Sequence, residues 1–252
     1  MASPVAIGTS YRSILLDARR GAIIAAIAFL TLVDLFAAQA VLPALTRAYG
    51  VSPGVMALAV NASTLGMAIA SVVVALISAR IERRRGIVIS LCLLALPTFL
   101  LAFAPDIATF SILRVLQGLC MATAFSLTLA YLGENCASHV ASGAFAAYIA
   151  GNVASNLLGR LASASLADHL GLRGNFLALA LLNLVGAAFV IATIRSSRAP
   201  AAGHMSGEGL AGLRANLSRP EQRASYIIGF FILFAFIGAF SFINFVLSQP
   251  PI

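Results

Sequence analysis

Seven apolar stretches fill most of this 252-residue chain, and each is long enough to cross a lipid bilayer as a helix. A membrane-spanning helix needs about 20 mostly apolar residues. The stretches cover residues 21–45, 55–77, 87–104, 109–131, 141–166, 176–194 and 225–247. Charged residues make up only 10% of the chain, against about 25% of a soluble domain. The sequence therefore predicts an all-α, polytopic helical membrane protein.

The basic residues, all of them arginine, are distributed unevenly among the connections between these stretches. Most precede the first stretch or lie in the second and sixth connections: Arg12, Arg19, Arg20, Arg80, Arg83, Arg84, Arg85, Arg195, Arg198, Arg214, Arg219 and Arg223. Connections on the other side carry Arg47 and Arg173. Cytoplasmic loops are rich in Lys and Arg, so we expect a cytoplasmic N-terminus. This placement favours membrane orientation over nucleic-acid binding as the reason for the net charge of +8.

The chain divides into a cytoplasmic N-terminal segment, a six-span unit, a polar cytoplasmic linker and the first span of a further unit. These segments are residues 1–20, 21–194, 195–224 and 225–252. Many transporters consist of two six-helix halves with the substrate site at their interface. Because the chain stops directly after the seventh stretch, we expect a truncated C-terminal half; a natural seven-helix protein is the alternative.

Three charged residues lie inside apolar stretches: Asp34, Arg114 and Arg160. Charges within a membrane are costly and usually functional. Estimated depths place Asp34 and Arg114 close enough to meet inside the bundle. Burial disfavours a charged carboxylate and a neighbouring arginine favours it. We therefore expect Asp34 to carry the proton of a transport cycle, with Arg114 as its partner; a static structural ion pair is the alternative.

The stretch 141–166 carries two lines of residues spaced four apart. One line is small: Gly143, Ala147, Gly151, Ser155, Gly159, Ser163 and Ala167. Small residues at this spacing let two helices approach closely, and we expect the partner helix to lie outside this chain. The other line is polar: Tyr148, Asn152, Asn156 and Arg160. It predicts a cavity wall, with helix packing and interhelical hydrogen bonds as the alternative.

Further polar side chains are scattered through the stretches: Gln39, Asn61, Thr64, Gln117, Asn183 and Asn244. Each alone favours an interhelical hydrogen bond, and together they suggest a polar cavity. The third and sixth stretches are poorest in charge, so we expect them to face lipid. We find no catalytic motif, nucleotide-binding loop, cofactor site or metal-ligand spacing, so neither an enzyme nor a metalloprotein is expected.

The segment between the second and third stretches resembles the first signature of the major facilitator superfamily, G-x-x-x-D-R-x-G-R-R. Arg80, Arg83 and Arg84 match its basic residues, whereas Glu82 replaces a glycine and Ala79 replaces the acid. The resemblance implies a cytoplasmic gating loop formed by Arg80, Glu82, Arg83 and Arg84.

Two further motifs carry the same resemblance. Arg114, Gln117 and Gly118 match the family's R-x-x-Q-G motif, in which the arginine is implicated in proton coupling. Gly151 to Gly159 resembles the glycine pattern of drug–proton antiporters, with Arg160 where proline is usual. Residues 39–43 and 238–251 are similar to a bacterial subgroup of efflux transporters.

The resemblance implies a secondary transporter of the bacterial inner membrane that exports small organic molecules in exchange for protons by alternating access. The implied cavity and packing residues are Gln39, Asn61, Gln117, Gly118, Tyr148, Gly151, Asn152, Asn156, Gly159, Arg160 and Asn244. The expected partners are substrate, protons, the lipid bilayer and a missing C-terminal half or a second copy. A non-transporting remnant and a half-size protein that acts as an oligomer are the alternatives.

Overall fold

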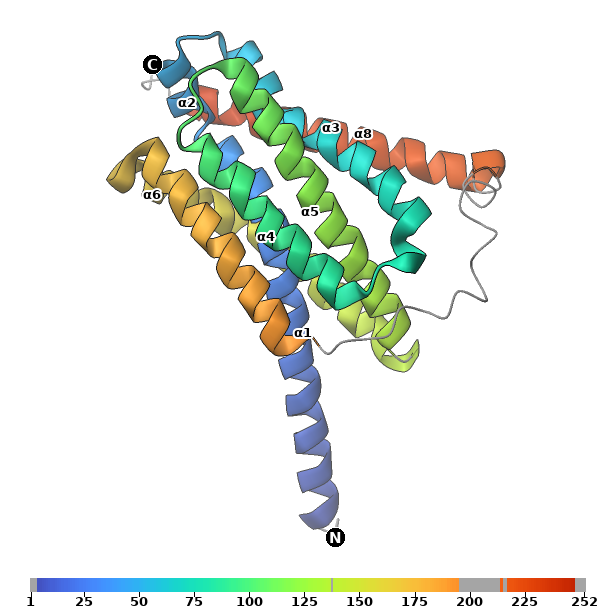
Figure 1. Ribbon diagram of the computed structural model, residues 1–252. Helices are drawn as coiled ribbons and strands as arrows, with labels where there is room; N and C mark the ends of the chain where they lie inside the picture. Colours follow the sequence, from blue (N-terminus) through green and yellow to red (C-terminus); the bar gives the residue numbers. More distant parts are fainter. Residues whose placement is uncertain (1–3, 137, 195–213, 215–216, 248–252) are drawn as a thin grey trace.

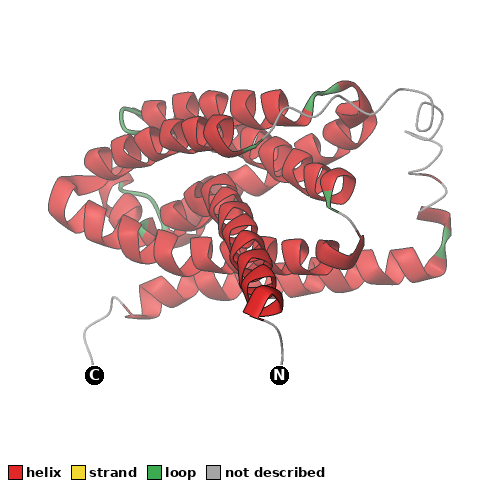
Figure 2. Ribbon diagram, turned by 90° about the horizontal axis from the view of Figure 1, so that it is seen from below, coloured by secondary structure: helices red, strands yellow, loops and turns green. Residues whose placement is uncertain are grey.

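The computed structural model describes residues 4–136, 138–194, 214 and 217–247, and side chains within 19–78, 80–136, 141–194, 214, 217–240 and 242–243. Within these ranges every regular element is a helix (Figure 1, Figure 2). The elements are α1 (Pro4–Ala40), α2 (Leu42–Tyr49), α3 (Pro53–Ile77), the 3-10 turn η1 (Ser78–Arg80), α4 (Arg83–Leu101), α5 (Ile107–Asn135), α6 (Ser138–Thr193) and α8 (Pro220–Leu247). The predicted all-α membrane fold is confirmed.

Within the described ranges, 6 helices are long and apolar enough to cross a membrane, and one of them holds two predicted stretches. That helix is α6, whose apolar segment Ala141–Thr193 contains both 141–166 and 176–194. Its backbone turns at Gly171, which has a φ of 72° and a ψ of 176°. A side chain would clash in this conformation, so glycine permits the reversal. Figure 1 shows the two arms of α6 folding back on each other.

The first predicted stretch, 21–45, is not one helix. Helix α1 ends at Ala40 and a separate short helix, α2, begins at Leu42. Pro43 explains the break, because its ring would clash with the preceding turn and it has no N–H to continue the ladder. In the first turn of α2 that missing N–H costs nothing, and Gly50 ends the helix with a φ of 63°.

The helices before α8 form one bundle whose ends alternate along the chain. The start of α1, the α3–α4 connection and the end of α6 lie at one end of the bundle, and the α4–α5 connection and the turn within α6 lie at the other (Figure 1). Helix α5 packs against α3 and α4, and α4 also packs against α6. Gly66 of α3 and Gly118 of α5 face each other's helix so closely that a Cβ on either would meet backbone.

The partner of the small-residue line on α6 is α1, which corrects our expectation that it lies outside the chain. A Cβ at Gly151 would strike the backbone of Ala25. Ser163 is buried and its hydroxyl donates to the carbonyl of Ala37 at 2.8 Å. The line is therefore used within this chain, because small residues such as Gly151 and Ser163 let the α1 backbone come close.

Helix α8 differs from the rest because it packs only lightly against the bundle, near α1, α2 and Arg160 of α6. Its described side chains are exposed or partly exposed, including large apolar ones such as Phe230 and Phe234. The predicted linker 195–224 falls mostly outside the described residues, and its last residues, from Pro220, already belong to α8.

A surface pocket of about 740 Å³ is lined by residues of the α4–α5 connection, including Asp106, and by Tyr49 and Arg173. Asp106 caps α5 by accepting from the Thr109 amide at 2.8 Å. That bond, with a second from the Thr109 hydroxyl, holds the pKa of Asp106 below its ordinary value. None of the predicted site residues lines this pocket.

Candidate functional site

Asp34 and Arg114 lie in one buried polar network that joins five helices. Its side chains come from α1, α3, α4, α5 and the second arm of α6: Asp34, Ser63, Thr98, Arg114, Gln117 and Asn183. The exposed fraction is 1% or less for Asp34, Arg114 and Gln117. Every polar atom here must therefore find its partner inside the protein.

Each nitrogen of the Arg114 guanidinium donates to an oxygen of a neighbouring residue. Its Nε donates to the Val60 carbonyl at 2.9 Å, Nη1 to Gln117 Oε1 at 2.6 Å and Nη2 to Ser63 Oγ at 3.0 Å. Nη1 also reaches the backbone carbonyl of Asp34 at 3.3 Å. Arg114 thus bridges α3, α5 and α1 through a rigid fork of donors.

The Asp34 carboxyl group is held less firmly. Its Oδ1 accepts from Gln117 Nε2 at 3.4 Å and from Thr98 Oγ1 at 3.3 Å. The single hydroxyl proton of Thr98 has a closer acceptor, the Leu94 carbonyl at 2.8 Å. Asp34 Oδ2 and Asn183 Oδ1 are both buried without a hydrogen-bond partner. An oxygen in this situation is suited to gaining a proton, because a neutral carboxyl can donate where a carboxylate cannot.

The predicted meeting of Asp34 and Arg114 is therefore indirect. Ion pairs within 4.0 Å among the described residues are Arg83–Glu134 and Arg85–Glu82. Gln117 links the two groups, since its Oε1 accepts from Arg114 and its Nε2 donates to Asp34. A neutral amide between the charges leaves the carboxyl group free of a direct cationic partner.

The sequence did not single out Thr98, which accepts from Gln117 Nε2 at 2.6 Å and from Asn183 Nδ2 at 3.3 Å. Its only signal was a hydroxyl directly after Pro97 in an apolar stretch. The third and sixth stretches do expose apolar side chains, such as Leu93 and Leu181. They also bring Thr98 and Asn183 to the network, so a description of them as purely lipid-facing is incomplete.

A second polar chain runs from α3 through α1 to the first arm of α6. Asn61 Oδ1 accepts from Gln39 Nε2 at 3.0 Å, and Gln39 Oε1 accepts from Arg160 Nη2 at 2.5 Å. Arg160 Nε donates to Asn156 Oδ1, one turn back on α6, at 2.7 Å. Two sides of the guanidinium are thus fixed by neutral amides.

The rest of the Arg160 guanidinium lies among aromatic rings and unmatched polar atoms. Its Cζ is 4.7 Å from the ring centroid of Phe240 on α8 and 5.8 Å from that of Phe36 on α1. Arg160 Nη1 and Asn152 Oδ1 are buried without a hydrogen-bond partner. This site therefore lies where α8 approaches the bundle.

The remaining predicted residues divide between packing and the polar chain. Tyr148 is 2% exposed, and its ring lies 5.3 Å from that of Phe125, whose carbonyl accepts from the Tyr148 hydroxyl at 3.3 Å. It therefore packs against α5, apart from Arg160. Gly159 contacts Val33, much as Gly151 contacts Ala25. The side chain of Asn244 lies outside the described residues.

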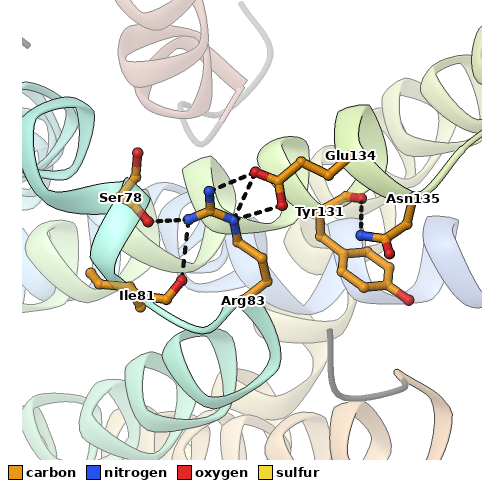
Figure 3. Close-up of polar contacts among 6 residues, drawn as sticks. All are labelled: Ser78, Ile81, Arg83, Tyr131, Glu134 and Asn135. Atoms are coloured by element: carbon orange, nitrogen blue, oxygen red, sulfur yellow. Dashed lines mark hydrogen bonds and ion pairs between the residues drawn. The ribbon is translucent and has the colours of Figure 1, made fainter. Parts of the chain in front are cut away.

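At the end of the bundle where α1 begins, the predicted gating loop is tied to α5. Arg83 is 3% exposed and donates from Nη2 to Glu134 Oε1 at 2.6 Å. Its Nε reaches both oxygens of Glu134, and its Nη1 donates to the carbonyls of Ser78 and Ile81. Figure 3 shows the guanidinium held between these groups. Glu134 was missed in the sequence, although an acid at the end of an apolar stretch was the available signal.

The other residues of this loop have separate roles. Glu82 forms an ion pair with Arg85 at 3.1 Å, and the Arg85 side chain is 84% exposed. Arg84 Nη2 donates to the Ile191 carbonyl at 2.7 Å, near the end of α6. Arg80 is exposed. The loop is therefore fastened to both α5 and α6.

Within the ranges that the structure describes, no three His, Cys, Asp or Glu side chains lie together as a metal-ligand set. The chemistry available in the two networks comes instead from one carboxyl group, two guanidinium groups, amides and hydroxyls. Such groups exchange protons and bind polar or charged molecules.

Two curated relatives are transporters. The uncharacterized MFS-type transporter YybF of Bacillus subtilis (strain 168) is 26% identical over 225 residues, which is 88% of this chain and 55% of that protein. The uncharacterized transporter BU588 of Buchnera aphidicola subsp. Acyrthosiphon pisum (strain APS) is 23% identical over 224 residues, with 88% and 55% covered. The chain spans about half the length of the curated relatives it matches. These matches do not favour the remnant or oligomer alternatives.

A solved structure shares the fold. It is a bacterial homolog to the human lysosomal transporter Spinster in an inward-facing and occupied conformation, with a TM-score of 0.64, 14% identity, and 82% of this chain and 49% of that chain covered. The family profile described as Major Facilitator Superfamily matches residues 24–249. Together with the membrane-spanning helices, this match confirms the resemblance: the chain is an integral membrane protein that belongs to the major facilitator superfamily of transporters.

Proposed function

We propose that this chain takes part in proton-coupled export of small organic molecules across the bacterial inner membrane, with Asp34 as the proton carrier. The observation that carries the proposal is the buried Asp34 carboxyl group, whose Oδ2 has no donor and whose Oδ1 has only long contacts. An intramembrane carboxyl group in this state exchanges its proton more readily than one in a tight ion pair.

Protonation of Asp34 would change the hydrogen bonds of the network that joins α1, α3, α4, α5 and α6. A neutral carboxyl group donates from Oδ2, and the unpartnered Asn183 Oδ1 on α6 is an available acceptor. Loss of the proton removes this donor and returns the negative charge next to Gln117 and Arg114. The two states therefore favour different contacts between α1 and α6, which is what coupling to alternating access requires.

The arrangement of arginines supports a cytoplasmic N-terminus. The described Arg19, Arg83, Arg84 and Arg85 belong to segments at the end of the bundle where α1 begins. A cluster of arginines at one end of a membrane bundle favours the cytoplasmic side for that end. The Arg83–Glu134 contact then serves as a cytoplasmic fastening that opens and closes as the helices move.

Proton movement in vesicles that contain the chain tests the coupling. We would record internal pH with a fluorescent dye while neutral, cationic and anionic organic compounds are added. The chain is expected to give compound-dependent proton flux, and Asp34→Asn is expected to reduce it at least about tenfold, because the amide cannot release a proton.

Asp168→Asn is the matched control, since Asp168 is an exposed carboxylate on α6. It should leave the flux unchanged. If Asp34→Asn retained the proton dependence of the unmodified chain, Asp34 would not be the proton carrier. If no compound moved protons with the unmodified chain, the proposed exchange by this chain would be wrong.

A further inference from the structure

Arg160 is an intramembrane cation whose hydrogen-bond partners in the described part of the chain are neutral. It bonds to the amides of Asn156 and Gln39, and neither of the ion pairs within 4.0 Å among described residues includes it. The next acid on α6, Asp168, is exposed and lies eight residues further along, roughly 12 Å away. Charges within a membrane ordinarily pair with an opposite charge or a backbone carbonyl, and among the described residues Arg160 bonds to side-chain amides instead.

One edge of the guanidinium has no hydrogen-bond partner. Nε and Nη2 are engaged by Asn156 and Gln39, which fix the plane of the group. Nη1 is shielded by protein and has no partner. Because the orientation is set in advance, an acid group can bind without the entropic cost of ordering a long side chain.

The surroundings suit an anion with an apolar body. Phe240 and Phe36 lie 4.7 Å and 5.8 Å from Arg160 Cζ. Aromatic faces next to a guanidinium are favourable and offer stacking surface. Asn152, whose Oδ1 is buried without a partner, lies two turns before Arg160 on the same helix and can accept from a hydroxyl or N–H of the same molecule.

We propose that Arg160 binds the acid group of the transported molecule, so that the substrates are small organic anions with an apolar or aromatic body. The acid group binds at Nη1 when the protein groups that shield this nitrogen move aside, and the apolar body lies against Phe240 and Phe36. This inference rests on the proposed function and narrows its substrate class.

Equilibrium binding of radiolabelled benzoate to the purified full chain in detergent tests the site without any proton gradient. Unlabelled benzoate should compete, whereas benzamide, which has the same ring but no charge, should compete at least about tenfold less well. Arg160→Gln should weaken benzoate binding at least about tenfold, because a charged hydrogen bond is lost. Arg160→Lys keeps the charge without the planar fork, so its benzoate affinity should lie between those of the unmodified chain and Arg160→Gln.

Arg173→Gln provides the matched control. Arg173 also lies over a phenylalanine, 5.9 Å from the Phe103 ring, but it is exposed. The Arg173→Gln variant should bind benzoate with the same affinity as the unmodified chain. Equal competition by benzamide, unchanged binding in Arg160→Gln, or no saturable benzoate binding by the unmodified chain would each overturn the anion site.

The anion site and the proposed exporter can fail separately. If benzoate does not bind but a neutral or cationic compound drives proton flux through Asp34, only the anion site is wrong. If benzoate binds through Arg160 but no compound moves protons, the site stands and the proposed function is wrong.

Discussion

The two polar networks differ in how completely this chain satisfies them. Around Arg114, each nitrogen of the guanidinium has an oxygen partner from α1, α3 or α5. Around Arg160, amides hold two nitrogens, and the third is buried without a hydrogen-bond partner. The same residue type is thus a structural centre in one place and an incomplete binding group in the other.

This difference shows how one buried arginine can stabilise the helix bundle while another remains available to bind a ligand. A buried arginine with a complete set of acceptors stabilises the helices that supply them. One with a nitrogen left unpartnered contributes less to stability and gains more when a ligand binds. Asp34 lies between these cases, because it belongs to the enclosed network yet has one oxygen without a donor.

The largest effect is expected when each guanidinium is removed in turn, which tests whether Arg114 stabilises the protein more than Arg160 does. Arg114→Gln should lower the free energy of unfolding by about 3–5 kcal/mol, because it leaves several buried acceptors without a donor. Arg160→Gln should cost about 1 kcal/mol, the net value of an ordinary hydrogen bond. Unfolding in mixed detergent micelles measures both. Equal losses of unfolding free energy in the two variants would contradict the distinction between the Arg114 network and the Arg160 network.

The second test concerns the α1–α6 contact that positions Arg160. Gly151→Ala should cost about 1–3 kcal/mol, since the methyl group meets the backbone of Ala25. Gly143 is the control on the same line, because a Cβ there meets nothing within 4 Å. Gly143→Ala should be neutral or stabilise by up to about 1 kcal/mol through helix propensity. Thermal unfolding of the two variants compares them, and equal melting temperatures would disprove close packing at Gly151.

The smallest effect is expected at the end of the bundle where α1 begins, where two ion pairs differ in burial. Glu134→Gln should cost about 1 kcal/mol, because Arg83 is buried and loses its carboxylate. Arg85→Gln should change stability by less than about 0.5 kcal/mol, since Arg85 is exposed. Chemical unfolding at low and high salt checks both. A larger loss of stability in Arg85→Gln than in Glu134→Gln would contradict the expectation that the buried ion pair contributes more than the exposed one.

Particular residues show how much of the candidate site could be predicted from the sequence. Asp34, Arg114 and Arg160 could be found because a charge in an apolar stretch is conspicuous. Thr98 could not, because a hydroxyl in a helix usually bonds to its own backbone, and Thr98 does so with Leu94 as well. Glu134 was overlooked because its meaning depends on Arg83, which is distant in sequence and adjacent only in the folded bundle.

The sequence by itself determined the class of this protein. Apolar length dictates membrane-spanning helices, and Pro43 and Gly171 dictate where the chain breaks or reverses. The tertiary structure alone decided which helix packs on the small residues of α6, that Gln117 separates Asp34 from Arg114, and that Arg160 keeps an unpaired edge. The physical reason is that hydrophobicity and backbone restrictions act locally along the chain. Hydrogen-bond partners are chosen by which helices lie side by side.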